Sequence, residues 1–262
     1  MKNILITGVC GGMGYAAAGQ FIRAGFRVFG IDRRPSCDLP IDYFCADITD
    51  ESSIDEVRAK ISTETEKLDA VLHFAGIYNL DSLIEISEEE FVRIFNINLF
   101  GIYRINKAFV PMMDNGGRVV ITSSELAPLD PLPFTGLYAI SKSAVEKYAY
   151  SLRMELNLHG ISVSIIRPGA VKTDMLGVST AALENFCKKT KRYSYNALNF
   201  RRVVDSVEAR NVCPEKIADV AFKAVSARHP RYIYNINRNP LLRMLNAFPK
   251  RMQVWIITKI LK

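Results

Sequence analysis

A glycine-rich turn between an apolar run and a helical run is the feature that most constrains this chain. Residues 2–7 are typical of a strand buried on both faces, and residues 15–24 favour a helix. A second apolar run, residues 26–32, follows after Gly25, which is a suitable helix cap. Together these segments predict a βαβ unit of about 30 residues.

The turn itself contains Gly8, Gly12 and Gly14. Glycines without a Cβ atom let the backbone turn tightly and approach a pyrophosphate, whose charge is favoured by a helix N-terminus. The position between a strand and a helix therefore predicts a dinucleotide-binding turn. A turn with a purely structural role is the alternative.

Asp32 ends the second strand of this unit. A carboxylate there accepts hydrogen bonds from the ribose hydroxyls of an adenosine and disfavours a 2′-phosphate, which predicts NAD rather than NADP. Arg33 and Arg34 follow directly and leave NADP open, because either guanidinium could reach a phosphate. The alternative for Asp32 is a capping or solvated role.

The alternation of strands and helices continues along the chain. We expect further strands at residues 42–46, 68–74, 117–122 and 161–166, and helices at residues 51–66, 88–113 and 141–158. Such alternation predicts an α/β fold, a doubly wound parallel sheet with helices on both faces. Functional groups are then expected at the carboxyl ends of the strands.

Composition excludes several other classes of protein. The 262 residues are 49% apolar and 23% charged, which fits an ordinary folded chain. The five cysteines form no C-x-x-C pair, so we expect reduced structural thiols, no metal site and a cytoplasmic protein. No run approaches the roughly 20 apolar residues that span a bilayer. The net charge of +7 arises after residue 219, which argues against a general nucleic-acid surface.

Tyr138 and Lys142 lie four residues apart at the start of a helical run, so both lie on one helix face. A phenol with its usual pKa near 10 is a poor acid–base catalyst at neutral pH unless a nearby cation lowers that pKa. Lys142 is placed to be that cation. Tyr103 and Lys107 have the same spacing, but they lie within a helix and away from any strand end, where an exposed or packed pair is the ordinary interpretation.

Several motifs in order resemble the short-chain dehydrogenase/reductase family. They are Thr7-Gly8-x-x-x-Gly12-x-Gly14, Asn98, Ser124 and Tyr138-x-x-x-Lys142, and the resemblance covers about residues 1–175. It implies a Rossmann-type single domain over residues 1–262, a nicotinamide cofactor and an alcohol or carbonyl substrate. It also implies a catalytic set and a set of cofactor-binding residues. The catalytic set is Asn98, Ser124, Tyr138 and Lys142; the cofactor set is Gly8, Gly12, Met13, Gly14, Asp32, Asp47, Ile48, Ala75, Gly76, Tyr138, Lys142, Pro168, Val171 and Thr173.

The resemblance also implies roles for these residues. Tyr138 exchanges the alcohol proton, with its pKa lowered by Lys142 and by the positive oxidised nicotinamide. Ser124 hydrogen-bonds the substrate oxygen. Lys142 also holds the cofactor ribose, and Asn98 positions a water that relays protons. Gly11, which is not basic, supports NAD.

Two positions depart from the family pattern. His73 and Phe74 precede Ala75-Gly76, where the family has two asparagines, and we expect His73 to be structural. Ser124 lies fourteen residues before Tyr138, where thirteen is common. Ser123 is therefore the alternative serine, although Ser124 fits the end of the strand better.

Two late segments leave alternatives open. Residues 175–213, which begin with Met175-Leu176-Gly177, follow a late strand and predict a substrate lid or a surface excursion. Residues 240–262 form a basic amphipathic tail that reads as two short helices. This tail either covers the substrate pocket, packs on a partner subunit or contacts an anionic membrane surface.

The resemblance extends to hydroxysteroid and retinol dehydrogenase-like members, through Leu132-Pro133-Phe134 and the apolar tail. It implies an apolar substrate, with a hydroxysteroid first and a retinol-like or small alcohol as alternatives. It also implies a homodimer or homotetramer formed through the helices that begin near Glu88 and Ser141. A non-catalytic dinucleotide sensor would be expected to lose Ser124, Tyr138 or Lys142, and a methyltransferase would need none of them.

Overall fold

The computed structural model describes residues 1–208 and 210–262; for residues 174–179 and 205–208 it describes the backbone alone. Within these residues one parallel sheet has the strand order β3-β2-β1-β4-β5-β6-β7. The reversal of order between β1 and β4 confirms the predicted doubly wound sheet. Its strands are β1 (Asn3–Thr7), β2 (Arg27–Asp32), β3 (Asp42–Cys45), β4 (Ala70–His73), β5 (Arg118–Thr122), β6 (Ser162–Pro168) and β7 (Ile233–Ile236).

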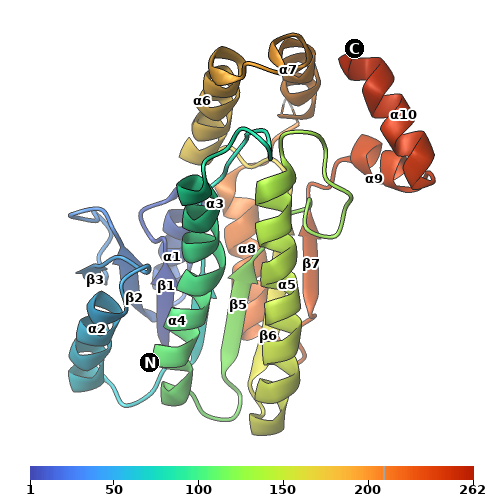
Figure 1. The fold of residues 1–262 in the computed structure, drawn as a ribbon. Coiled ribbons are helices and arrows are strands. Elements are labelled where there is room, and N and C mark those ends of the chain that lie inside the picture. The colour runs from blue at the N-terminus through green and yellow to red at the C-terminus, as the bar shows by residue number, and fades with distance from the viewer. Residues whose placement is uncertain (209) are drawn as a thin grey trace.

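Helices cover both faces of the sheet (Figure 1). One face packs on α1 (Gly12–Arg23) and α8 (Pro214–Ser226), and the other packs on α2 (Glu51–Glu64), α4 (Gly101–Phe109) and α5 (Gly136–Leu156). The central strands β1 and β4 are buried almost throughout, because apolar side chains on alternate positions enter opposite cores. The two cores and the sheet between them make one α/β domain.

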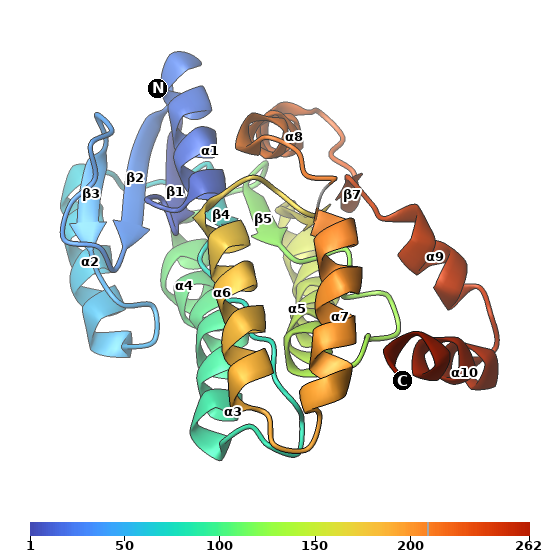
Figure 2. The same ribbon diagram turned by 90° about the horizontal axis from the view of Figure 1, so that it is seen from above.

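Four further helices lie beyond the carboxyl ends of the strands (Figure 1). Seen from that side, α6 (Asp174–Lys189) and α7 (Ser194–Glu208) cross the end of the sheet (Figure 2). The C-terminal helices α9 (Pro240–Asn246) and α10 (Lys250–Leu261) continue from β7 along the edge of this layer. The predicted tail is thus two short helices.

The structure differs from the sequence expectation at three places. The predicted helix over residues 88–113 is divided into α3 (Glu88–Phe95), a π-helix (Asn96–Phe100) and α4. Helix α5 begins at Gly136 rather than at residue 141, so Tyr138 lies inside its first turn. Helix α8 and strand β7 were not anticipated. Among the described residues, no helix is long and apolar enough to span a membrane.

Candidate active site

The glycine turn after β1 forms one wall of a cleft of about 430 Å³. Gly8 has a positive φ of 70°, and a Cβ atom there would lie 2.5 Å from the Ala75 nitrogen. A Cβ atom on Gly12 would lie 2.6 Å from Thr173 Cγ2, and one on Gly14 would lie 2.2 Å from the Gly8 carbonyl oxygen. These three positions therefore require glycine, and their close contacts shape the turn.

The first turn of α1 opens onto this cleft. Gly11 is its N-cap and has no side chain to bond the first N–H groups. Gly12, Met13 and Gly14 line the cleft, so the N–H groups of this first turn are available to an anion. The turn thus fits the pyrophosphate of a dinucleotide. Ten of the predicted cofactor residues line the cleft: Gly8, Gly12, Met13, Gly14, Asp32, Asp47, Ile48, Ala75, Gly76 and Thr173.

Asp32 is held in this cleft by two backbone groups. Its Oδ2 accepts a hydrogen bond from Cys10 N at 3.0 Å, and its Oδ1 accepts one from Arg34 N at 3.1 Å. Arg34 Nη1 donates to the Cys10 carbonyl oxygen at 2.9 Å. Arg33 also lines the cleft and is exposed. Asp32, Arg33 and Arg34 therefore all line the same cleft.

A second cavity, of about 180 Å³, adjoins the cleft and shares Met13, Gly76 and Thr173 with it. Ser124, Tyr138, Lys142, Pro168 and Val171 line this cavity. The structure thus brings all the predicted site residues except Asn98 onto two adjoining hollows at the carboxyl ends of the strands. The lining of the cavity includes residues at the ends of β5 and β6 and residues of α7.

The two candidate serines after β5 have different partners. Ser123 Oγ donates a hydrogen bond to Glu146 Oε1 at 2.9 Å, and Glu146 also pairs with Arg167 at 2.6 Å. Ser124 Oγ accepts from Leu126 N at 3.2 Å and interacts with the Tyr138 phenol. Ser124 is therefore the serine placed to act together with Tyr138.

Tyr138 is buried in the first turns of α5, and its ring lies 4.8 Å from that of Tyr78. Burial raises the pKa of Tyr138 to about 12, and the hydrogen bond with Ser124 opposes this rise. The expectation that Lys142 lowers this pKa is wrong for the structure described. Lys142 Nζ lies 6.0 Å from the centre of the Tyr138 ring and is not among the causes of the shifted pKa.

Lys142 is buried one helical turn further along α5. Its Nζ donates a hydrogen bond to the Thr122 carbonyl oxygen at 3.1 Å. Burial lowers the pKa of Lys142 to about 8, and the negative charge of Glu146 acts in the opposite direction. This amine is therefore close to its titration range at neutral pH. Tyr103 and Lys107 are the other tyrosine and lysine four residues apart. There Lys107 lies on the surface and forms an ion pair with Glu51 at 2.7 Å.

Asn98 lies in the π-helix and is completely buried. Its Oδ1 accepts from Ile77 N at 2.8 Å, and its Nδ2 donates to the Ile77 carbonyl oxygen at 3.0 Å and to Ser141 Oγ at 3.1 Å. A Cβ atom on Gly76 would lie 3.2 Å from Asn98 Oδ1 and 3.6 Å from Lys142 Nζ. Asn98 thus fixes the loop after β4 just behind the cavity. A π-helix at such a position is frequent in functional sites.

His73 has a structural setting. Its Nε2 lies 2.9 Å from Asn106 Oδ1, and Asn106 Nδ2 donates to the Tyr148 hydroxyl at 3.2 Å. Burial lowers the pKa of His73 to about 4, so the ring is neutral at physiological pH. This hydrogen-bond network joins β4 to α4 and α5.

The predicted lid region, residues 175–213, is mostly helical and contributes to the cavity; residue 209 within it lies outside the described residues. Phe200, Val203 and Val204 of α7 line the cavity. Phe134 has a positive φ of 67° and places its ring against three rings of this region. The ring centres lie 4.6 Å from Phe186, 5.3 Å from Tyr193 and 5.4 Å from Phe200.

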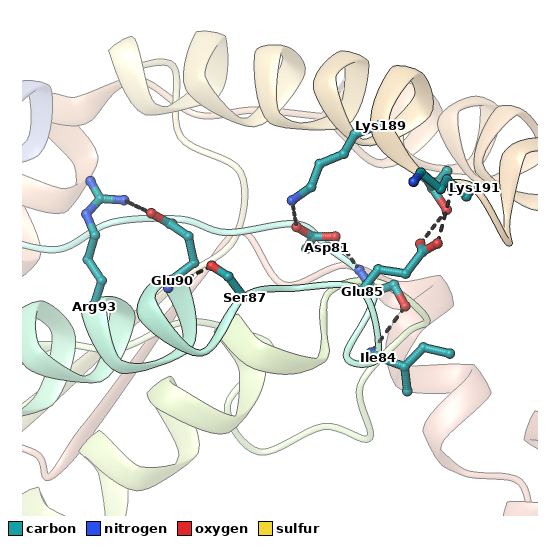
Figure 3. Close-up of polar contacts among 10 residues, drawn as sticks. Asp81, Ile84, Glu85, Ser87, Glu90, Arg93, Lys189 and Lys191 are labelled. Atoms are coloured by element: carbon teal, nitrogen blue, oxygen red, sulfur yellow. Dashed lines mark hydrogen bonds and ion pairs between the residues drawn. The ribbon is translucent and has the colours of Figure 1, made fainter.

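The turn between α6 and α7 is fastened to the loop before α3 (Figure 3). Lys189 Nζ pairs with Asp81 Oδ2 at 2.8 Å. Glu85 accepts hydrogen bonds from Thr190 Oγ1 at 2.6 Å and from the backbone nitrogens of Lys191 and Arg192 at 3.1 and 3.0 Å. The Thr190 hydrogen bond is the largest cause of the lowered pKa of Glu85. We call these contacts the lid latch.

The C-terminal helices lie beside the same cavity. Leu242 of α9 lines it, and Ile257 and Leu261 of α10 pack on the apolar cluster that includes Phe200. The position of Leu242 agrees with one of the three alternatives for the tail, that it covers the substrate pocket. Sequence reasoning missed Glu125 as a cavity residue, although its position directly after Ser124 was a signal.

Comparison with known proteins identifies the family. The short chain dehydrogenase model matches residues 2–184, so the chain belongs to the short-chain dehydrogenases. It is thus an oxidoreductase of a family that binds a nicotinamide cofactor and acts on alcohol or ketone groups.

Three proteins illustrate the likeness. 3-Ketodihydrosphingosine reductase of Bacteroides thetaiotaomicron is 26% identical over 250 residues, which cover 94% of this chain and 91% of the relative. Estradiol 17-beta-dehydrogenase 2 of Mus musculus is 25% identical over 257 residues, which cover 89% of this chain and 67% of the relative. The crystal structure of BdcA in complex with NADPH superposes with a TM-score of 0.71 at 22% identity and covers 90% of this chain and 93% of that one.

Proposed function

We propose that the chain interconverts a ketone and a secondary alcohol on an apolar substrate, with NAD as the preferred cofactor. The observation that carries this proposal is that Ser124, Tyr138 and Lys142 line one cavity, which joins the glycine-lined cleft. The other wall of the cavity is largely apolar. It includes Leu126, Leu132, Phe200, Val203, Val204 and Leu242.

In this proposal each side chain has a separate task. Tyr138 donates a proton to the ketone oxygen, or accepts one from the alcohol in the reverse direction. Ser124 hydrogen-bonds the same oxygen as its negative charge develops. Lys142 holds the ribose of the cofactor, and Asn98 keeps the loop at Gly76 in place. A bound nicotinamide supplies or accepts the hydride.

Two kinds of apolar substrate are supported. A long-chain ketone is favoured by the likeness to a 3-ketodihydrosphingosine reductase along 94% of this chain. A hydroxysteroid is the second candidate, favoured by the likeness to an estradiol dehydrogenase. Both have a large apolar part that is compatible with the largely apolar cavity.

A substrate panel tests the proposal. Oxidation of NADH and NADPH is followed by the loss of nicotinamide absorbance with 3-ketodihydrosphingosine, estrone, retinal and a small polar ketone. We expect at least one apolar substrate to exceed the polar ketone about tenfold or more in kcat/KM, a modest difference for an apolar pocket. Dinucleotide binding without turnover of any ketone or alcohol would instead support a non-catalytic sensor.

We also propose that α10 contacts an anionic membrane surface. Gln253, Ile257 and Leu261 face inward, whereas Trp255 is 62% exposed. Arg251 and Lys259, four residues to either side of Trp255, share its outward face and are exposed. Residues 220–262 contain nine Lys or Arg and no acidic residue. Exposed apolar side chains with flanking cations match the interface of an anionic bilayer.

A homodimer or homotetramer is a further proposal. Tyr103 on α4 and Tyr150 and Met154 on α5 are exposed apolar side chains on helices that lie on the same face of the sheet. Their burial would be favourable in an assembly. Light scattering after size-exclusion chromatography should give two or four times the chain mass of 29.4 kDa. A monomer that persists at high concentration would contradict it.

A further inference from the structure

Glu125 is an unusual residue in the substrate cavity. It directly follows Ser124, and its backbone nitrogen donates to the Pro168 carbonyl oxygen at 2.9 Å. Glu125 lines the same cavity as Ser124 and Tyr138 and is only 6% exposed. A carboxylate is therefore held within an otherwise largely apolar cavity, beside the proposed reacting groups.

Only one of the two oxygen atoms of this carboxylate accepts a hydrogen bond from the described part of the protein. Oε2 accepts a hydrogen bond from Asn239 N, at the N-cap of α9, at 2.6 Å. Oε1 lies against Gly169, where a Cβ atom would be 3.0 Å away. In the described part of the chain, Oε1 accepts no hydrogen bond and Glu125 forms no ion pair. Arg238 attracts the carboxylate only at longer range.

The charge of Glu125 is not explained by its structural contact. A neutral acceptor such as glutamine would also bond Asn239 N. A buried carboxylate without a direct ion pair is destabilised, because it loses water and the longer-range attraction of Arg238 compensates only in part. Burial accordingly raises the pKa of Glu125. A cation supplied from outside the protein would remove this cost and occupy Oε1.

We propose that Glu125 binds a protonated amine on the substrate, next to the carbon that reacts at Ser124 and Tyr138. The substrate class is then an apolar amino ketone or the corresponding amino alcohol. The amine N–H donates to Oε1, and the apolar remainder contacts side chains such as Phe200 and Val204. This inference rests on the proposed function, since it defines the substrate of the same cavity.

The experiment compares two long-chain ketones that differ only in an amine on the carbon next to the carbonyl group. For each, kcat/KM is measured with the wild type and with Glu125→Gln, which keeps an acceptor for Asn239 N and loses the charge. The wild type should prefer the amine at least tenfold. In the variant, the ratio of the two kcat/KM values should fall about 10- to 100-fold, the worth of a hydrogen bond to a charged group.

Asp130→Asn is the matched control. Asp130 lies outside the cavity, where it accepts from Gln253 Nε2 at 3.0 Å and pairs with Lys250. This variant loses the same charge and should keep the wild-type ratio. An unchanged ratio in Glu125→Gln, or no preference for the amine in the wild type, would overturn the proposal. The wild-type comparison remains decisive if Glu125→Gln does not fold.

A binding measurement separates this inference from the proposed function. Dodecylammonium and dodecanol are titrated into the wild type and into Glu125→Gln by calorimetry, without any turnover. Tighter binding of dodecylammonium that is lost in Glu125→Gln supports the amine site even if no ketone is reduced. Equal binding of the two probes by the wild type contradicts it, even if some other ketone is reduced.

Discussion

The Lys142 ammonium group donates a hydrogen bond to the carbonyl oxygen of Thr122 at 3.1 Å. Thr122 is the last residue of β5, and Ser124 follows two positions later. The contact therefore joins the helix that positions Tyr138 to the strand that positions Ser124. It also holds a buried amine beside Gly76, where the cleft and the substrate cavity meet.

Lys142 is expected to reduce stability at neutral pH. Its pKa falls from an ordinary value of 10.5 to about 8 in the folded chain. Between these two pH values the unfolded chain binds more protons, so the free energy of unfolding rises with pH through this window. At pH 7 the full penalty is present. At this pH the free energy of unfolding of Lys142→Met should exceed that of the wild type by about 1–2 kcal/mol. This figure is the penalty removed minus the contribution of the lost hydrogen bond.

Urea unfolding at pH 7, 8, 9 and 10 checks this prediction for the wild type and Lys142→Met. The difference between them should shrink as the pH rises, while the variant loses activity at every pH. Lys107→Met, at an exposed lysine, should keep the wild-type pH dependence. If Lys142→Met were less stable than the wild type at pH 7, burial of the Lys142 ammonium would not reduce the stability of the fold.

The lid latch predicts a specific role for Glu85. Glu85→Ala removes the acceptor for Thr190, Lys191 and Arg192, so the turn between α6 and α7 should open more often. Proteolysis within residues 175–213 should become about tenfold faster, as the open state becomes more populated. The KM of Glu85→Ala for an apolar ketone should also rise, because the lid contributes to the substrate cavity.

Glu90→Ala is the control for this experiment. Glu90 pairs with Arg93 at 3.1 Å within α3, and its other contact drawn in Figure 3 is with Ser87 at the start of the same helix. It loses the same charge and should leave the rate of proteolysis unchanged. Equal acceleration in the two variants would mean that the latch contacts do not hold the lid.

Asp32 is predicted to set the preference for NAD. In the wild type, kcat/KM with NAD should exceed that with NADP about tenfold, because a 2′-phosphate would meet the carboxylate. Asp32→Ala should reduce this ratio by about tenfold or more, since Arg33 then faces the phosphate unopposed. Asp55→Ala, at an exposed carboxylate on α2, should not change it. A wild type that prefers NADP would show that Arg33 and Arg34 dominate.

Helix α10 predicts binding to anionic vesicles. The wild type should sediment with phosphatidylserine vesicles, fail to do so with phosphatidylcholine alone, and be released by high salt. The double variant Arg251→Glu, Lys259→Glu should bind at least about tenfold more weakly, since each cation near the surface contributes about 1 kcal/mol. Trp255→Ser should also weaken binding.

Arg58→Glu, Lys60→Glu on α2 is the control, because both side chains are exposed and equally basic. It should bind the vesicles as the wild type does. Loss of binding in both double variants would mean that net charge alone attracts the vesicles. A change in molecular mass for Trp255→Ser in light scattering would assign this face to a partner subunit.

The sequence predicted the parallel sheet because its strands are strong local signals. Residues 2–7 contain the apolar run Ile4–Ile6, residues 161–166 have apolar side chains at positions 161, 163, 165 and 166, and the structure places β1 and β6 there. The glycine turn was also predictable, because its glycines lie between a strand and a helix and Gly14 packs against the nearby Gly8 carbonyl oxygen. These features depend on neighbours in the chain, so a single sequence is sufficient.

Other features depend on contacts between distant segments. The π-helix around Asn98 interrupts a helical pattern that runs on in the sequence, and Asn98 bonds Ile77 across the fold. The pKa of Tyr138 rises because tertiary packing buries it, which a spacing of four residues does not reveal. Leu242 reaches the cavity because β7, which pairs with β6, brings α9 to that end of the sheet.

The proton transfer assigned to Tyr138 is tested most directly by Tyr138→Phe. This variant keeps the ring against Tyr78 and loses only the hydroxyl that interacts with Ser124. With the apolar ketone that the wild type reduces best, kcat should fall about 10²- to 10⁴-fold, while the Kd for NADH, measured by fluorescence, should stay within about threefold. A variant that retains near-wild-type kcat would contradict the account.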